Sequence, residues 1–97
     1  MDICICKEEL EYVAYILKAL SNANRLMILS ILAKNGEMNV SDICDNIKCT
    51  QPLISHHLTD MQSKGILKMR REGRNIYYSL ENQRVIDIIR CISECKR

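Results

Sequence analysis

The sequence predicts an α+β fold that is mostly helical, and two observations support this. Residues 50–80 combine a helix with a polar outer face, a glycine stop and a basic two-stranded hairpin. Three segments with the apolar spacing of helices precede this stretch, and a fourth follows it. One domain over residues 1–97 therefore contains four helices, a β-hairpin and a last helix, after a short cysteine-containing arm at about residues 1–6. This order is that of a winged helix-turn-helix.

The first half of the chain predicts two helices joined by a short turn. Apolar residues recur at helical spacing over Lys7–Leu20. Ser21 or Asn22 can cap a second helix over residues 23–34, which the Asn-Gly pair at 35–36 ends. This second helix is apolar on most sides, so we expect it near the centre of the fold.

A short link and a brief helix come next. Residues 37–40 are expected to form a short extended link. Ser41 is expected to cap a helix that runs to about Lys48. Asp42 would lie in its first turn, where the helix dipole favours an acidic side chain.

The fourth helix is the one whose outer face is unusual. Thr50 caps it, Pro52 lies in its first turn, where a missing N–H costs little, and Gly65 ends it. At about 100° per residue, one side of this helix is apolar and faces the core. That side carries Ile54, Leu58 and Met61.

The opposite side of this helix carries short polar groups and no long charged side chain, although exposed helices normally carry Glu and Lys. Hydroxyl and imidazole groups can reach base edges or phosphates, so we expect this side to contact DNA. His57 falls at the margin of the core and is expected to be a hydrogen-bonded structural residue, whereas His56 faces outward. The outward residues are Pro52, Ser55, His56, Thr59 and Ser63.

A basic hairpin follows this helix. Leu67–Glu72 and Asn75–Leu80 alternate as strands around a turn at Gly73. The net charge of the chain is only +2, but the cations gather here against a single acid, Glu72. Such a cluster can be merely a solvated face, yet beside a polar-faced helix it favours phosphate contact. The cations are Lys64, Lys68, Arg70, Arg71 and Arg74.

The last helix begins at about Asn82 and is amphipathic. The chain has no Trp and no Phe, and a core built only from smaller apolar residues favours a partner surface, so we expect a homodimer. An enzyme is disfavoured, since there is no Cys/His pair on a shared face, no glycine-rich phosphate loop and no carboxylate pair in a pocket. No catalytic cofactor is therefore expected.

Six cysteines in 97 residues call for a chemical or structural role. The N-terminus has neither a basic region nor a long apolar run, and no segment has the length of a membrane span, so a cytoplasmic protein without a membrane partner is expected. Thiols stay reduced in that compartment. Binding of a metal or metalloid, or redox chemistry, is then favoured over a disulfide framework.

Several motifs occur in the order found in one family. They are Leu17-Lys18-Ala19-Leu20, Asn24-Arg25-Leu26 through Leu29, Thr50-Gln51-Pro52, Ser55-His56-His57-Leu58, Gly73-Arg74 and Tyr77-Tyr78. Over roughly residues 10–95 the chain thus resembles the ArsR/SmtB family of bacterial and archaeal repressors. The resemblance implies a homodimer, joined through the first and last helices, that leaves its operator DNA when an inducer binds. It also implies that Thr50, Gln51, Ser55 and His56, with Arg74 and neighbouring basic residues of the wing, contact the DNA.

The sensor sites of that family do not match this chain. One type uses Cys-x-Cys in the third helix segment, another uses Asp-x-His with a later His pair, and a third pairs a cysteine of the second helix with one of the last. The Cys-x-Cys positions of the first type hold Asn39 and Ser41 in this chain. The Asp-x-His and later His positions of the second type correspond to Asn82, Arg84 and Cys95, and the second-helix cysteine of the third type corresponds to Ser30. The inducer site must therefore lie elsewhere in the chain.

Cysteine pairs near the two ends of the chain are the candidates for that site. Cys91 and Cys95 are spaced i, i+4 and share a helix face, while Cys4 and Cys6 lie two apart on the arm, where an extended backbone directs both thiols the same way. Trivalent arsenic needs three sulfurs, so Cys91, Cys95 and one arm cysteine would hold arsenite or antimonite, with cadmium, lead or copper(I) as further soft ions. An arm cysteine could instead reach Cys44.

The same cysteines are also compatible with structural and redox roles. Cys91, Cys95 and Cys44 can be small apolar fillers. Alternatively, Cys91 and Cys95, or the arm pair Cys4 and Cys6, can form a disulfide or a longer sulfur bridge in a redox-responsive or persulfide-responsive repressor, although thiols one helical turn apart fit a direct disulfide poorly. A DNA-binding protein without an inducer is a further alternative, and Cys49 receives no role.

Overall fold

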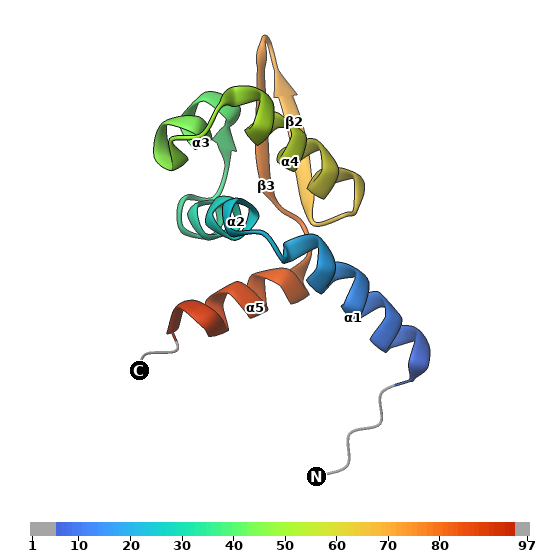
Figure 1. Ribbon diagram of the computed structural model, residues 1–97. Helices are drawn as coiled ribbons and strands as arrows, with labels where there is room; N and C mark the ends of the chain where they lie inside the picture. The colour runs from blue at the N-terminus through green and yellow to red at the C-terminus, as the bar shows by residue number, and fades with distance from the viewer. Residues whose placement is uncertain (1–5, 95–97) are drawn as a thin grey trace.

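The computed structural model describes residues 6–94 of the chain, with five helices and three strands (Figure 1). The helices agree closely with the sequence prediction. The elements are α1 (Lys7–Leu20), α2 (Ala23–Asn35), β1 (Met38–Asn39), α3 (Val40–Ile47), α4 (Gln51–Ser63), β2 (Leu67–Glu72), β3 (Asn75–Leu80) and α5 (Gln83–Glu94).

The strands form one antiparallel sheet in the order β1-β3-β2. The predicted hairpin is present, with Leu67 opposite Leu80 and Glu72 opposite Asn75. Where the sequence predicted only an extended link, Met38 pairs with Tyr78 and adds a third strand. A two-residue strand is too short to show alternation, so the sequence pattern could not reveal this pairing.

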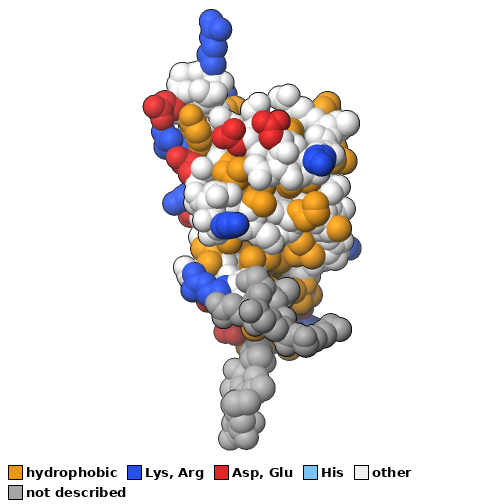
Figure 2. All heavy atoms as spheres, turned by 90° about the vertical axis from the view of Figure 1, so that its left-hand side faces the viewer, with side chains coloured by type: hydrophobic (Ala, Val, Ile, Leu, Met, Phe, Trp, Pro, Cys, Tyr) orange, Lys and Arg blue, Asp and Glu red, His pale blue; other side chains and the backbone are white. Residues whose placement is uncertain are grey.

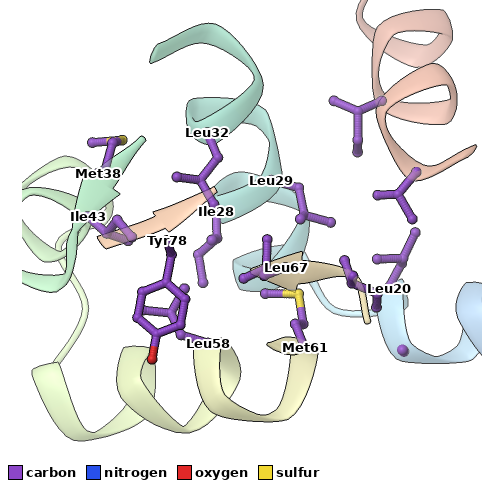
Figure 3. Close-up of a cluster of buried hydrophobic side chains, with 14 of the residues drawn as sticks. Leu20, Ile28, Leu29, Leu32, Met38, Ile43, Leu58, Met61, Leu67 and Tyr78 are labelled. Atoms are coloured by element: carbon purple, nitrogen blue, oxygen red, sulfur yellow. The ribbon is translucent and has the colours of Figure 1, made fainter. Parts of the chain in front are cut away.

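The core lies where α2, α3 and α4 meet the sheet (Figure 3). Ile28 and Leu29 of α2 are fully buried, as are Ile54 and Leu58 of α4. Because these aliphatic side chains fix one side of α4 against the body, its other side is held toward solvent. The hairpin extends beside α4 and away from the body, as a wing (Figure 1).

The caps of the helices are partly as expected. Asn22 caps α2, accepting hydrogen bonds from the backbone N–H groups of Asn24 and Arg25. The expectation that Ser41 caps α3 is wrong, because the cap is Asn39, whose side chain accepts from the N–H of Asp42 at 2.8 Å. The helix begins one residue before Ser41, which places Ser41 inside its first turn. Thr50 occupies the cap position of α4 without a side-chain capping bond.

Replacing Asn39 with alanine is expected to lower the free energy of unfolding by about 1 kcal/mol, because an orphan N–H of α3 loses its acceptor. Ser41→Ala is the matched control, and its effect should stay within about 0.5 kcal/mol. Urea unfolding of both variants measures the difference. Equal losses in the two variants would contradict the assignment of the cap.

None of the helices within residues 6–94 is long and apolar enough to cross a membrane alone. Together, α1 and α2 meet the length and composition of a span, but they are bent by 98° at the break between them. Ile28, Leu29 and Leu32 of α2 are buried within the fold.

Candidate DNA-binding interface and thiol positions

The two sides of α4 differ as the sequence predicted. Its buried residues are Ile54, His57, Leu58 and Met61. On the other side His56 and Thr59 are exposed and Ser55 is half-buried. Because the apolar side is packed into the core, this polar side is the part of α4 that can meet another molecule.

A groove of about 420 Å³ lies between this polar side, the start of α3 and the wing. From α4 it is lined by Gln51, Ser55 and Thr59, and from the wing by Arg74. Helix and wing candidates that are separate in the sequence therefore line one concave surface. Sequence reasoning missed the other polar lining groups, since nothing in the pattern shows that the start of α3 approaches the wing; they are Asn39, Ser41 and Asn75.

The basic side chains next to α4 differ in whether they form ion pairs with acidic residues. Arg70 donates two hydrogen bonds to the carboxylate of Glu37, at 2.7 and 3.1 Å, and also pairs with Glu72. It lies 4.8 Å from the centre of the Tyr77 ring. Its hydrogen bonds lower the pKa of the Glu37 carboxyl below its ordinary value. The positive charge predicted at Arg70 is thus largely neutralised within the free protein.

Lys64 and Lys68 are also paired, whereas the tip of the wing is open. Lys64 pairs with Asp60, and Lys68 lies 3.8 Å from a carboxylate oxygen of Glu81. Arg71 and Arg74 are exposed, and neither forms an ion pair within residues 6–94. In Figure 2 a basic side chain projects at the upper tip, where the hairpin turns. Arg71 and Arg74 are therefore the wing cations best placed to meet a phosphate.

Arg74→Gln is expected to weaken DNA binding for all sequences alike and to reduce the salt slope of the binding constant by about one. The reason is that one phosphate contact, and the counterion it releases, is lost. Titrations at several salt concentrations measure the slope. Lys34→Gln, in the last turn of α2 and not among the residues that line the groove, is the control and should leave the slope unchanged.

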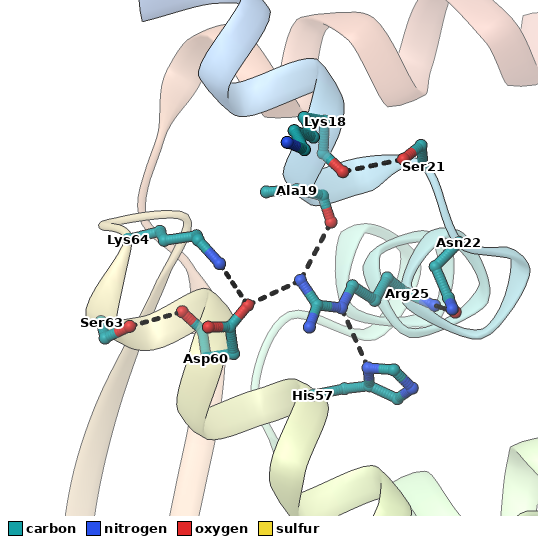
Figure 4. Close-up of polar contacts among 9 residues, drawn as sticks. All are labelled: Lys18, Ala19, Ser21, Asn22, Arg25, His57, Asp60, Ser63 and Lys64. Carbon is teal, nitrogen blue, oxygen red and sulfur yellow. Dashed lines mark hydrogen bonds and ion pairs between the residues drawn. The ribbon is translucent and has the colours of Figure 1, made fainter.

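His57 has the structural role that the sequence predicted. The residue is 6% exposed, and its Nδ1 accepts a hydrogen bond from Nε of Arg25 at 2.9 Å (Figure 4). The same guanidinium pairs with Asp60 at 2.7 Å. His57 therefore holds α4 against α2 and does not face outward with His56.

The described cysteines fall into two groups. Cys6, at the start of α1, and Cys91, on α5, are exposed. Cys44 and Cys49 are half-buried against the core, and burial, with smaller contributions from Asp45 and Cys49, raises the pKa of the Cys44 thiol. The predicted ligands Cys4 and Cys95 lie outside the described residues.

Cys6 and Cys91 are not neighbours within one protomer. The start of α1 and the end of α5 lie on opposite sides of the molecule (Figure 1). Within the described part of the chain, no group of three or more His, Cys, Asp or Glu side chains is arranged to hold a metal ion. Among the described residues, one protomer by itself therefore does not bring Cys6 and Cys91 together.

Comparison with known proteins agrees with this geometry. A family model described as bacterial regulatory protein, arsR family, matches residues 22–68. An uncharacterized HTH-type transcriptional regulator of Methanocaldococcus jannaschii, MJ1325, is 45% identical over 90% of this chain and 98% of its own length. A homologue of the cadmium resistance transcriptional regulatory protein CadC from Staphylococcus aureus is 38% identical over 79% of this chain, which spans 64% of that homologue.

Solved structures show the same architecture. The antimony-specific transcriptional repressor AntR superposes with a TM-score of 0.86 at 27% identity, over 96% of this chain and 86% of its own. The homodimeric winged helix-turn-helix DNA-binding domain of Mb0332 from Mycobacterium bovis, a possible ArsR-family transcriptional regulator, superposes with a TM-score of 0.77 at 30% identity. That match covers 96% of this chain and 87% of the Mb0332 fragment. The winged helix-turn-helix predicted from the sequence is confirmed.

Proposed function

The chain belongs to the ArsR/SmtB family of DNA-binding transcriptional repressors, and we propose that it is a homodimer released from its operator when cysteine thiolates bind a soft ion. The main observation in support of DNA binding is the groove that is lined by Gln51, Ser55 and Thr59 of α4 and by Arg74 of the wing. In it, short polar groups that can reach base edges lie beside a cation that can hold a phosphate.

The proposed DNA contacts come from α4 and the wing. Gln51, the first residue of α4, lies where the free N–H groups of the helix and its dipole favour a phosphate. Since Arg70 is paired with Glu37 and Glu72, its contact with DNA would require exchange of carboxylate for phosphate. The proposed residues are Thr50, Gln51, Pro52, Ser55, His56, Thr59 and Ser63 of α4 and its cap, with Lys64, Arg70, Arg71 and Arg74 after it.

The proposed dimer interface is the apolar side of α1 with α5. Leu10, Tyr15 and Leu17 of α1 are each about half exposed in the single chain. A mostly apolar hollow of about 260 Å³ lies between α1 and α5, with Leu17 and Ile88 among its lining residues. Large apolar side chains in such an arrangement favour burial against a second copy.

The proposed inducer site combines Cys91 and Cys95 of one protomer with Cys4 or Cys6 of its partner. Cys6 and Cys91 lie far apart within one chain, which supports a third sulfur from the partner's arm. Cys44, with an arm cysteine, is the alternative ligand. The names of the CadC homologue and AntR associate those relatives with cadmium and antimony, which supports a soft ion here. Arsenite or antimonite is the favoured inducer, followed by cadmium, lead or copper(I).

A second candidate is a repressor that responds to oxidants or persulfides. It is favoured by the exposure of Cys91 and by the lack of a three-donor cluster within residues 6–94. A sulfur bridge needs only two thiols, whereas a trivalent metalloid site needs three.

Operator binding at fixed salt, combined with thiol counting, tests both candidates. The reduced dimer is titrated onto operator DNA alone and with arsenite, antimonite, Cd(II), Zn(II) or persulfide. For the soft-ion proposal we expect release by arsenite or antimonite, with three thiols protected per ion. Release by persulfide alone would favour the second candidate, and unaltered affinity under every treatment would exclude both.

A further inference from the structure

Three helices meet at the side chain of Arg25, near the start of α2 (Figure 4). Its Nη1 donates to the backbone carbonyl of Ala19 in α1 at 3.1 Å and pairs with Asp60 of α4 at 2.7 Å. Its Nε donates to Nδ1 of His57, also in α4, at 2.9 Å. One side chain thus joins the last turn of α1 to two residues of the helix that carries the DNA-facing groups.

This contact is specific to a guanidinium. The Arg25 side chain is 12% exposed, so its partners replace water. The carbonyl of Ala19 belongs to the last turn of α1, where carbonyls have no partner inside the helix and the dipole favours a cation. The planar guanidinium carries its N–H donors on separate nitrogens, so that Nη1 meets the carbonyl and the carboxylate while Nε meets the imidazole, whereas the donors of lysine all lie on one nitrogen.

The contact depends on the protonation state of His57. Nδ1 can accept from Arg25 only while it carries no proton, so the neutral ring holds its proton on Nε2. The charged or titratable groups that face the ring are Arg25 from α2, with His56 and Asp60 from α4. Burial, then Arg25 and His56, lower the pKa of His57 below its ordinary value, against a smaller opposing effect of Asp60.

We propose that Arg25 is a positioning residue that couples the end of α1 to the recognition helix α4, and that a proton on His57 breaks this coupling and weakens operator binding. The inference rests on the proposed role of α4 in DNA recognition. A protonated His57 presents an N–H to the guanidinium in place of an acceptor. Two like charges then face each other in a buried place, and α4 loses a bond that fixes it against α2.

The sign of the pH effect follows from these contacts. The unfolded chain binds the proton at the ordinary histidine pKa of about 6.5, and the folded protein binds it only at lower pH. Stability from neutral His57 is therefore fully present above about pH 6.5, is lost as pH falls through that value, and levels off below the folded pKa. Operator affinity should decrease over the lower part of the same range.

The first test separates positioning from phosphate contact. Arg25→Gln is expected to lower operator affinity about tenfold or more, since α4 loses a charged hydrogen-bonded anchor. Its salt slope should equal that of the wild type, because Arg25 lies inside the fold and releases no counterion from DNA. Arg74→Gln is the contrasting variant, with a reduced slope. A reduced slope in Arg25→Gln, or an unchanged affinity, would overturn the positioning role.

The second test uses the fact that the chain contains only two histidines. Operator affinity is measured from about pH 8, through the ordinary histidine pKa of about 6.5, down to the lowest pH at which the dimer stays folded, at fixed salt for wild type, His56→Gln and His57→Gln. Glutamine at 57 can still accept from Arg25 through its amide oxygen but does not titrate. We expect affinity to fall with pH in His56→Gln and to stay level in His57→Gln. An equal fall in both variants would overturn the proton effect.

A third measurement needs no DNA and keeps the inference separate from the proposed function. NMR titration of His57 in the free dimer should give a higher pKa in Arg25→Gln than in wild type, since the facing cation is removed. An unchanged pKa would show that the two side chains are not coupled, whatever the operator data show. If the His57 pKa shifts but the wild type binds no operator, the coupling of Arg25 with His57 is supported. The proposed role of α4 in DNA recognition is then refuted.

Discussion

Replacing Leu17 with glutamate is expected to split the dimer and to lower operator affinity about 100-fold or more. Leu17 is 49% exposed in the single chain and lines the apolar hollow between α1 and α5. In the proposed dimer this surface is covered by the second copy, so the variant would bury a carboxylate without a partner. Two recognition helices on one protein bind two half-sites together, and a monomer loses that advantage.

Sedimentation equilibrium gives the oligomeric state, and operator titration of the same sample gives the affinity. Met27→Glu is the matched control, since Met27 is an exposed apolar residue of α2 that does not line the hollow. We expect Met27→Glu to remain a dimer with wild-type affinity. A dimer that persists in Leu17→Glu, or one lost equally in both variants, would refute α1 and α5 as the interface.

The recognition helix could be predicted in detail because its information is local. The spacing of Ile54, Leu58 and Met61 fixes which side is buried, and the polar side follows from it. The same periodicity placed His57 at the core margin, where the structure has it. What the pattern left open was its partner, since Arg25 lies 32 residues earlier in the chain.

The errors and omissions concern contacts between distant residues. Arg70 was predicted to contact phosphate from the wing, and its pairing with Glu37, 33 residues away, was not anticipated. The folding of β1 beside β3 brings these two residues together. The cap of α3 was misplaced by two residues for the same reason. Asn39 ends a strand whose pairing with Tyr77 has no signal of its own in the sequence.

The cysteine site could be predicted only in part from the sequence. Spacing alone places Cys91 and Cys95 on one helix face, and it groups Cys4 with Cys6 on the arm. It does not say which protomer supplies the arm. The divergence of α1 from α5 in Figure 1 is the reason for proposing the partner's arm, a contact that only a dimer could form.

Replacing Cys91 and Cys95 together with serine is expected to abolish release by arsenite while leaving operator affinity within about twofold of wild type. Hydroxyl oxygens are hard ligands that hold a soft metalloid poorly, so the site would keep at most the arm sulfurs. Cys91 is exposed on α5, an element that contributes no residue to the groove formed by α4 and the wing. Its loss should therefore affect the response and not DNA binding.

Cys44→Ser separates this site from its alternative. Cys44 packs against the core, so a hydroxyl there is expected to lower the free energy of unfolding by about 1 kcal/mol. Its arsenite response should persist if Cys91 and Cys95 form the site. Undiminished release in the Cys91/Cys95 variant, with loss of release in Cys44→Ser, would instead move the inducer to the end of α3. From there it would act through the turn that leads directly into α4.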